Sequence, residues 1–118
     1  KAGTVGYCLG GRMVYLMAAR SDADCNVGYY GVGIENNLDE AAHITAPTML
    51  HIAALDEYVP PEAQDKIKGG LADHPKVAIH VYPDVDHAFA RTDGRTYDKK
   101  AADLANKRSA DFFKTNLG

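Results

Sequence analysis

The chain has 118 residues, of which 46% are hydrophobic and 25% are charged, a composition that fits one globular domain at most. Its net charge of -3, without any stripe of lysine or arginine, argues against a nucleic-acid partner. No apolar stretch is long enough to span a membrane. Two cysteines are too few for a disulfide scaffold, so we expect a reducing, cytoplasmic setting.

An apolar strand is predicted over residues 2–8, and it stops abruptly at a cysteine. Residues 6–10 read Gly-Tyr-Cys-Leu-Gly, which is the G-x-[Ser/Cys]-x-G form of a nucleophile elbow. In such an elbow a strained turn between a strand and a helix holds the nucleophile, here Cys8. We expect side chains at Gly6 and Gly10 to collide with the neighbouring strand and helix. The plainer interpretation is that Cys8 is a small buried residue in a glycine-rich turn.

Strands and helices alternate along the rest of the chain. We predict strands over 27–30, 48–54 and 77–82, helices over 10–20, 60–72 and 97–116, and over 32–46 a loop with at most one helical turn. Met13, Leu16 and Met17 are expected on the buried face of the first helix. One side of the last helix carries Tyr97, Ala101, Leu104, Ala105, Arg108 and Phe112. This order implies an α/β fold, with a mostly parallel sheet of about four strands and flanking helices.

Three of the predicted strands are followed by residues that could form a catalytic triad. In a parallel sheet, reactive groups gather at the carboxyl ends of the strands. Cys8, Asp56 and His87 follow three such strands, in the chain order nucleophile, acid, histidine of an α/β-hydrolase. His87 would take the thiol proton of Cys8, Asp56 would fix the tautomer of His87, and the backbone N–H of Leu9 would be one oxyanion-hole donor. We expect the helix N-terminus and His87 to favour the Cys8 thiolate.

Other residue types near these positions have simpler interpretations. Asp56 could instead cap the turn that follows its strand, and Asp84 and Asp86 are rival acids that lie too close to His87 to come from another strand's end. Glu57 is expected in solvent and Cys25 to be an inert cysteine at a strand start. The remaining histidines lack matched neighbours, and no spacing of His, Cys and Asp suggests a metal site; these histidines are His43, His51, His74 and His80. We expect no metal or other cofactor.

Several segments together closely resemble dienelactone hydrolase (carboxymethylenebutenolidase) over essentially the whole chain. They are residues 6–11, 28–33, Asp56 with 59–60, and 87–92, with Gly-Tyr-Tyr-Gly-Val-Gly at 28–33 and His-Ala-Phe-Ala-Arg-Thr at 87–92. The resemblance implies the C-terminal half of an α/β-hydrolase whose triad is Cys8, Asp56 and His87, with Tyr29 and Arg91 as substrate-binding residues. The implied reaction opens an unsaturated lactone that bears a carboxylate and gives maleylacetate.

Arg91 has an independent rationale, because a guanidinium four residues after His87 can pair bidentately with a substrate carboxylate. It could otherwise be a solvated loop arginine. The chain begins with Lys1 and enters its first strand at once, so we expect it to be the second half of a longer enzyme. The resemblance places further strands, a glutamate, a second oxyanion N–H and a second arginine before the elbow of a complete enzyme.

Three functions remain open at this stage. The first is a cysteine-dependent lactone hydrolase, and the second is an esterase or thioesterase relative that acts on other small esters. The third is an inactive fragment that self-associates through an exposed sheet edge, since residues 2–7 would offer unpaired N–H and C=O groups with apolar side chains on both faces.

Overall fold

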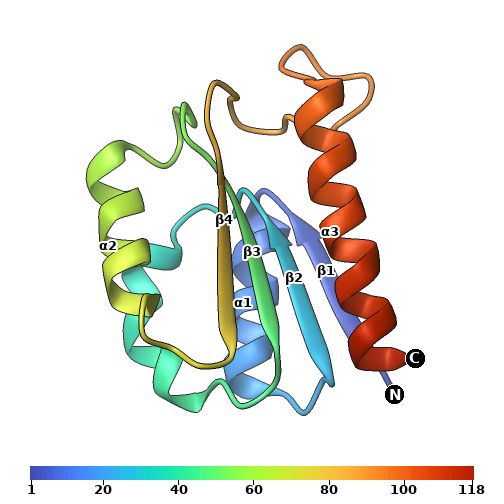
Figure 1. Cartoon of the computed structure of the whole chain (residues 1–118). Helices are drawn as coiled ribbons and strands as arrows, with labels where there is room; N and C mark the ends of the chain where they lie inside the picture. Colours follow the sequence, from blue (N-terminus) through green and yellow to red (C-terminus); the bar gives the residue numbers. More distant parts are fainter.

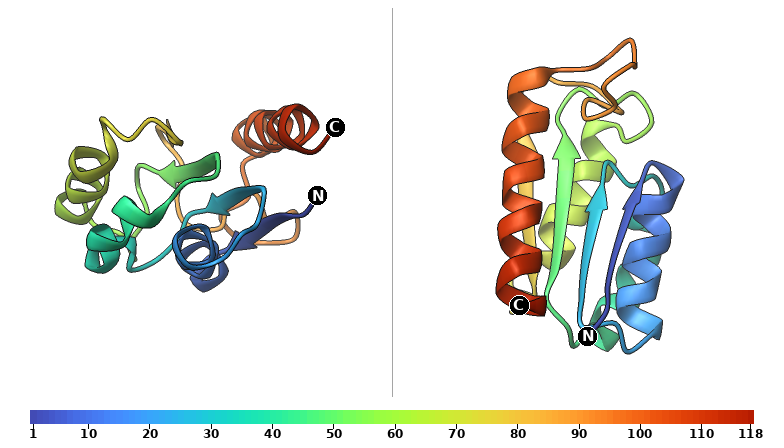
Figure 2. Two further views of the ribbon diagram at one scale, coloured as in Figure 1. Left: turned by 90° about the horizontal axis from the view of Figure 1, so that it is seen from below. Right: turned by 90° about the vertical axis from the view of Figure 1, so that its right-hand side faces the viewer.

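The computed structural model describes residues 1–118 and contains one parallel four-stranded sheet with the order β1-β2-β3-β4 (Figure 1). The strands are β1 (Gly3–Tyr7), β2 (Cys25–Tyr29), β3 (Thr48–Ala53) and β4 (Val77–Tyr82). All four strands run the same way, so their carboxyl ends lie at the end of the sheet opposite the two chain termini (Figures 1 and 2). The predicted strand positions are confirmed to within two residues at each end.

Helices cover both faces of the sheet, as predicted. The helices α1 (Leu9–Arg20) and α2 (Pro61–Leu71) lie on one face together with the 3-10 helix η1 (Ile34–His43), and α3 (Lys99–Leu117) lies on the other (Figure 2). The Asp98 side chain caps α3 by accepting a hydrogen bond from the Ala101 N–H at 2.9 Å. None of the helices is both long and apolar enough to cross a bilayer.

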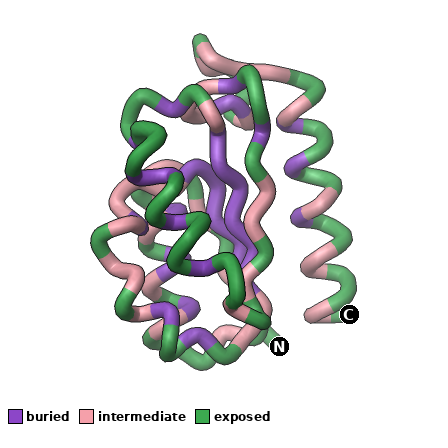
Figure 3. Tube along the Cα trace, turned by 60° about the vertical axis from the view of Figure 1, so that its left-hand side comes forward, coloured by how far each residue is buried: buried purple, intermediate pink, exposed green.

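The apolar core is divided by the sheet into two clusters. The central strands β2 and β3 are buried along their whole lengths, whereas β1 and β4 are edge strands (Figure 3). One cluster fills the space between the sheet and the layer of α1, η1 and α2; the other lies toward α3 and the carboxyl ends of the strands. The second cluster is rich in aromatic rings and directly supports the loops that carry the candidate site.

Residues 34–43 form 3-10 turns where a loop with at most one helical turn was predicted. The helix η1 has a kink at Asn37, and side chains of α1 hold that kink. Arg12 donates two hydrogen bonds to Asn37 Oδ1, at 3.0 and 2.9 Å, and the Tyr15 hydroxyl donates to the Asn37 carbonyl at 2.9 Å. Ile34, Leu38 and Ala41 of this segment pack against the core at a spacing of three to four residues, a helical pattern that the prediction missed.

The buried face of α1 is not the predicted one. Met13 and Met17 are 54% and 44% exposed, and the side chains buried instead are those of Val14, Tyr15 and Ala18. Gly11 sets this rotation, because α1 packs so closely there that a Cβ atom at Gly11 would lie 2.7 Å from the Tyr29 carbonyl oxygen. The buried positions therefore follow Gly11 at helical spacing.

Along α3, the buried residues are Ala102, Ala105 and Ser109, while Leu104 is exposed. The prediction for the side chains of the first strand needs correction. Along β1, the exposed side chains Val5 and Tyr7 share one face because they are two residues apart, so β1 does not offer apolar side chains on both faces. Its position at the sheet edge is as predicted.

Candidate active site

Cys8 occupies a strained turn between β1 and α1, as expected for a nucleophile elbow. Its φ of 58° lies in a region that L-residues rarely adopt. A Cβ atom at Gly6 would lie 2.2 Å from the Gly10 carbonyl oxygen, so only glycine fits there. The same expectation for Gly10 is wrong, because no atom lies within 4 Å of a Cβ built at that position. The close approach on this side of the turn falls on Gly11 instead.

The backbone around Cys8 leaves an N–H group free at the start of α1. The Cys8 N–H itself donates to the Tyr29 carbonyl at 3.1 Å, which ties the elbow to the end of β2. Leu9 is the first residue of α1, so its N–H is one of those that have no acceptor within the helix. This is the position that an oxyanion-hole donor requires.

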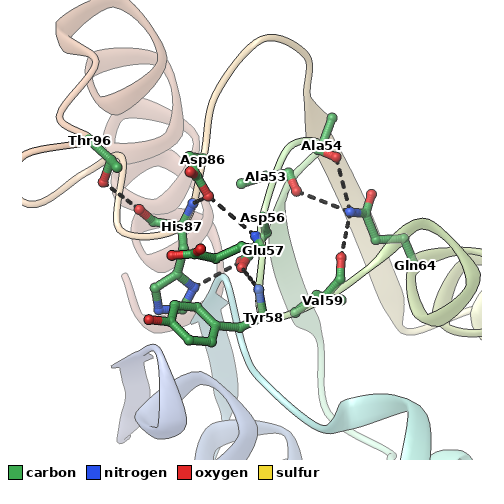
Figure 4. Close-up of polar contacts among 10 residues, drawn as sticks. All are labelled: Ala53, Ala54, Asp56, Glu57, Tyr58, Val59, Gln64, Asp86, His87 and Thr96. Atoms are coloured by element: carbon green, nitrogen blue, oxygen red, sulfur yellow. Dashed lines mark hydrogen bonds and ion pairs between the residues drawn. The ribbon is translucent and has the colours of Figure 1, made fainter.

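Asp56 and His87 form a hydrogen-bonded pair at the carboxyl end of the sheet. His87 Nδ1 lies 2.8 Å from Asp56 Oδ2, and the Asp56 side chain is only 1% exposed (Figure 4). An ionised carboxylate only accepts hydrogen bonds, so the proton lies on Nδ1 and His87 Nε2 is left as the basic nitrogen. Asp56 Oδ1 also accepts from the Tyr58 N–H at 2.9 Å, so the carboxylate both caps its own turn and orients the histidine.

The two loops that carry this pair are tied by side chains that the sequence did not single out. Gln64 of α2 is buried and its Nε2 donates to the carbonyl oxygens of Ala53, Ala54 and Val59, at 3.3, 3.1 and 2.8 Å (Figure 4). These bonds close the loop around Asp56. A buried polar residue on an otherwise apolar helix face was the only signal in the sequence, and it gave no partner.

The loop of His87 is tied in the same way. Asp86 Oδ1 accepts from the His87 N–H at 2.6 Å and from the Glu57 N–H at 3.3 Å, so Asp86 joins the two loops through the backbone. It does not contact the imidazole, which excludes it as the orienting acid in this arrangement. The Thr96 hydroxyl donates to the His87 carbonyl (Figure 4). Asp84 and Glu57 are exposed, as expected for Glu57.

A cavity of about 360 Å³ lies beside Cys8. Its lining residues come from the elbow, the end of β2, the loop after β4 and α3: Tyr7, Cys8, Tyr30, Ala88, Ala90, Arg91, Thr92, Asp93 and Asn106. Arg91 also lines a second cavity together with His87. The ring of Tyr30 packs edge-on against the imidazole of His87, with the ring centroids 5.2 Å apart, and so connects the cysteine side of the site with the histidine side.

Tyr29 does not line the cavity beside Cys8, contrary to the sequence-based expectation. It is 2% exposed, and its hydroxyl lies within the layer between the sheet and α3, 2.7 Å from Ser109 Oγ and 2.8 Å from Asn106 Oδ1. The next residue takes the place at the cavity because strand side chains alternate between faces and Tyr30 adopts a positive φ of 38° at the strand end. Resemblance at a Tyr-Tyr pair could not decide between the two.

The electrostatic surroundings of Cys8 favour the thiol rather than the thiolate. Partial burial raises the pKa of Cys8, the Asp56 carboxylate raises it further, and the Arg91 guanidinium lowers it. Cys8 Sγ makes no hydrogen bond with His87 in this structure. The expectation of a favoured thiolate is therefore wrong for this arrangement, and attack by the sulfur requires a base to remove the proton.

Neither the other cysteine nor the buried histidine lines the cavity beside Cys8. Cys25 is buried at the start of β2, at the opposite end of the sheet from Cys8, and burial raises its pKa. His51 is 1% exposed and both of its ring nitrogens have hydrogen-bond partners, so it is a satisfied core histidine. The structure brings no three His, Cys, Asp or Glu side chains together in a way that could hold a metal ion.

The Dienelactone hydrolase family sequence model matches residues 1–117. The chain belongs to this family. Over 112 residues it is 41% identical to carboxymethylenebutenolidase of Pseudomonas putida, covering 95% of this chain and 48% of that protein. A protein of Azospirillum brasilense that carries the same name provisionally is 53% identical over 110 residues, covering 93% of this chain and 48% of that protein. The chain thus spans about half the length of these relatives.

Solved structures agree with the family and the fold. The chain superposes on the crystal structure of a provisionally named dienelactone hydrolase from Klebsiella pneumoniae with a TM-score of 0.85 and 26% identity. That match covers 95% of this chain and 51% of the other. The prediction of an α/β-hydrolase fold of the dienelactone hydrolase kind is confirmed.

Proposed function

We propose that this chain carries the catalytic triad of a lactone hydrolase, in which Cys8 is the nucleophile, His87 the general base and Asp56 the residue that orients the base. The observation that carries the proposal is the 2.8 Å hydrogen bond between His87 and the buried Asp56 carboxylate, at the same sheet end as a cysteine in a strained elbow. Two features support it further. His87 Nε2 is free to accept a proton, and Cys8 opens on a cavity large enough for a small ring.

The reaction proposed for this geometry has two stages. His87 Nε2 takes the Cys8 thiol proton as the sulfur bonds to the lactone carbonyl carbon, and the Leu9 N–H stabilises the resulting oxyanion. The ring C–O bond then breaks, and His87 returns the proton to the departing oxygen. The product is a thioester between Cys8 Sγ and the former lactone carbonyl carbon. The former ring oxygen, now protonated, stays on the opened chain. Water, deprotonated by His87, hydrolyses the thioester and restores the thiol.

The substrate that suits this cavity bears a carboxylate. Arg91 is the only cationic side chain in the lining of the cavity beside Cys8, and it also lines the cavity beside His87. Its only ion-pair partner is Asp93, at 3.4 Å, and both side chains are more than two-thirds exposed, so the guanidinium is free to exchange partners. The opening of a carboxylated unsaturated lactone (dienelactone) to maleylacetate is the reaction we propose. A neutral small ester or thioester is the competing substrate class.

Covalent capture tests the proposal directly. The chain is mixed with a carboxylated unsaturated lactone, quenched with acid and digested, and the Cys8 peptide is expected to carry the mass of the opened lactone. Cys8→Ala should abolish both this adduct and turnover, whereas Cys25→Ala should change neither. An adduct on Cys25, or turnover that survives in Cys8→Ala, would contradict the assignment. Parallel assays with neutral esters and thioesters separate the competing substrate classes.

Self-association of residues 1–118 is a second proposal, and the edge position of β1 favours it. Val5 and Tyr7 are 50% and 49% exposed on this strand, and Leu9, Met13 and Met17 form an exposed stripe along the adjacent α1. An apolar edge strand with unpaired N–H and C=O groups is a template for pairing with another chain. Light scattering should give a mass that rises with concentration, and Val5→Lys should lower it. A monomer at all concentrations would contradict this proposal.

A further inference from the structure

A row of hydrogen bonds runs through the layer between the sheet and α3, beneath the cavity of Cys8. Arg108 donates to the Tyr82 hydroxyl at 3.2 Å, and that hydroxyl lies 2.8 Å from His51 Nδ1. His51 Nε2 lies 2.8 Å from Ser109 Oγ, the next member of the row. Tyr82, His51 and Ser109 are all buried, so none of them can exchange its partner for solvent.

The row continues to the cavity itself. Ser109 Oγ lies 2.7 Å from the Tyr29 hydroxyl, which donates to Asn106 Oδ1 at 2.8 Å. Asn106 is exposed on α3 and lines the cavity together with Cys8 and Arg91. Five hydrogen bonds therefore connect Arg108, at one end, with a side chain of the candidate site, at the other.

The direction of every proton in the row follows from its first member. Arginine can only donate, so the Tyr82 oxygen accepts from Arg108, and the only acceptor in the row for the proton of the buried Tyr82 hydroxyl is His51 Nδ1. His51 is neutral, because burial lowers its pKa to about 3, with His80 and Arg108 contributing in the same sense. A neutral imidazole that accepts at Nδ1 carries its proton on Nε2, which it donates to Ser109.

The same reasoning fixes the amide of Asn106. Ser109 accepts from His51 and so donates its proton to the Tyr29 oxygen, and the Tyr29 proton goes to Asn106 Oδ1. The Oδ1 atom of Asn106 therefore accepts a hydrogen bond from the buried Tyr29 hydroxyl and points toward the interior. Its NH₂ group has no hydrogen-bond partner in the structure and belongs to a side chain that lines the cavity.

We propose that Asn106 is a further ligand-binding residue, whose NH₂ group donates a hydrogen bond to the carboxylate of the bound molecule, and that Arg108, Tyr82, His51, Ser109 and Tyr29 are positioning residues that hold the amide in this orientation. The choice of a carboxylate rests on the proposed function and on Arg91, which lines the same cavity. Tyr29, which does not reach the cavity, thus acts on the bound molecule through Asn106.

The test uses furan-2-carboxylate, a flat five-membered ring with a carboxylate and no bond that the site could cleave. Uncharged furan-2-carboxamide is its matched control. Binding is measured on the ¹⁵N-labelled chain by NMR titration. The Asn106 side-chain amide signals are expected to shift saturably with the carboxylate, and the His51 nitrogens should show the Nε2–H tautomer at neutral pH.

Variants at Asn106 give the quantitative test. Asn106→Leu should weaken binding of the carboxylate about tenfold, the loss of one hydrogen bond to a charged group, and Asn106→Asp should weaken it more because a like charge is added. Binding of the carboxamide should change by less than about threefold in Asn106→Leu. Asn36→Asp, which adds the same charge at an exposed position in η1, should leave both affinities unchanged.

Each result decides the matter. Carboxylate affinities within twofold of the parent in both Asn106 variants, no saturable binding of the carboxylate, or a His51 proton on Nδ1 would overturn the inference. Because the probe is not cleaved, a chain that binds it through Asn106 but opens no lactone would refute the proposed function alone. A chain that opens lactones with no dependence on Asn106 would refute this inference alone.

Discussion

The two halves of the candidate site are built differently. The acid–base half, Asp56 and His87, is held by buried hydrogen bonds from Gln64 and by Asp86, which ties its two loops together. The nucleophile half, with Cys8, has an unbonded sulfur and opens on a cavity that is lined in part by exposed side chains, Arg91 and Asn106 among them. The histidine is fixed before any substrate arrives, whereas the sulfur and the carboxylate-binding groups have room to adjust to what binds. We call the acid–base half the closed half and the nucleophile half the open half.

This contrast also divides the work between the halves. A base that must accept and return a proton benefits from one fixed tautomer, which the buried Asp56 carboxylate supplies. A neutral thiol needs no hydrogen-bond partner that fixes it in advance, because its proton is removed only when the carbonyl carbon of the substrate is in place. The four predictions that follow would break or sharpen this division, and the first concerns its strongest contact.

Replacing the buried carboxylate should have the largest effect. Asp56→Asn leaves a side chain of the same shape but lets His87 adopt the wrong tautomer, so lactone turnover should fall by about 10⁴, as it does when the acid of a serine triad is changed in this way. Asp84→Asn removes the same charge from an exposed position in the next loop and should have no effect. Similar turnover in the two variants would show that Asp56 only caps its turn.

In the open half, the largest loss is expected from Arg91. Arg91→Ala should reduce the stabilisation of the transition state for a carboxylated lactone by about 1.5–3 kcal/mol, the range for a hydrogen bond to a charged group. The kcat/KM for a neutral ester should hardly change. Arg20→Ala, an equal charge change at the last residue of α1, is the control, because Arg20 lines neither the cavity beside Cys8 nor the one beside His87. Ratios of kcat/KM for the two substrates provide the measurement. Equal losses on both substrates would make Arg91 a structural residue.

The sequence predicted the closed half better than the open one. The ends of strands in a parallel sheet can be predicted from apolar runs, and both members of the closed half, Asp56 and His87, follow such runs. In the open half, the same signal indicated Cys8 but not the side chains that line its cavity. The choice between Tyr29 and Tyr30 depended on the backbone at a strand end, where a positive φ turns one ring toward the cavity. No local pattern encodes such a turn at a non-glycine residue.

The helices show the same limit. The rotation of α1 is set by the close approach of Gly11 to the carbonyl of Tyr29, a contact between segments 18 residues apart in the chain, and periodicity alone favoured Met13 and Met17. The supports of the site were also out of reach. Gln64 and Ser109 are polar residues on buried helix faces, and only their partners across the fold explain them.

A support of the closed half should affect stability as well as turnover. Gln64→Leu keeps the volume but leaves the carbonyls of Ala53, Ala54 and Val59 without this donor, which should cost about 1–3 kcal/mol in the free energy of unfolding. The loop that carries Asp56 then loses the hydrogen bonds that hold its two ends together, so Asp56 is less well fixed and turnover should also fall. Glu62→Leu, on the exposed face of the same helix, is the control for urea unfolding. Unchanged unfolding with Gln64→Leu would show that water replaces the amide.

The smallest effect should appear at the sulfur. Burial and the Asp56 carboxylate raise the pKa of Cys8 and Arg91 lowers it, so Arg91→Ala should raise that pKa further. The shift should be less than about one pH unit, because the guanidinium is exposed and its field is screened by salt. The pH dependence of iodoacetamide alkylation measures it, since only the thiolate reacts, and buried Cys25 stays protected. Lys68→Ala, a charge removed on α2, should leave the midpoint unchanged. A midpoint that falls in Arg91→Ala would mean that Arg91 does not stabilise the thiolate, and that the open half of the site has a different electrostatic arrangement from the one described.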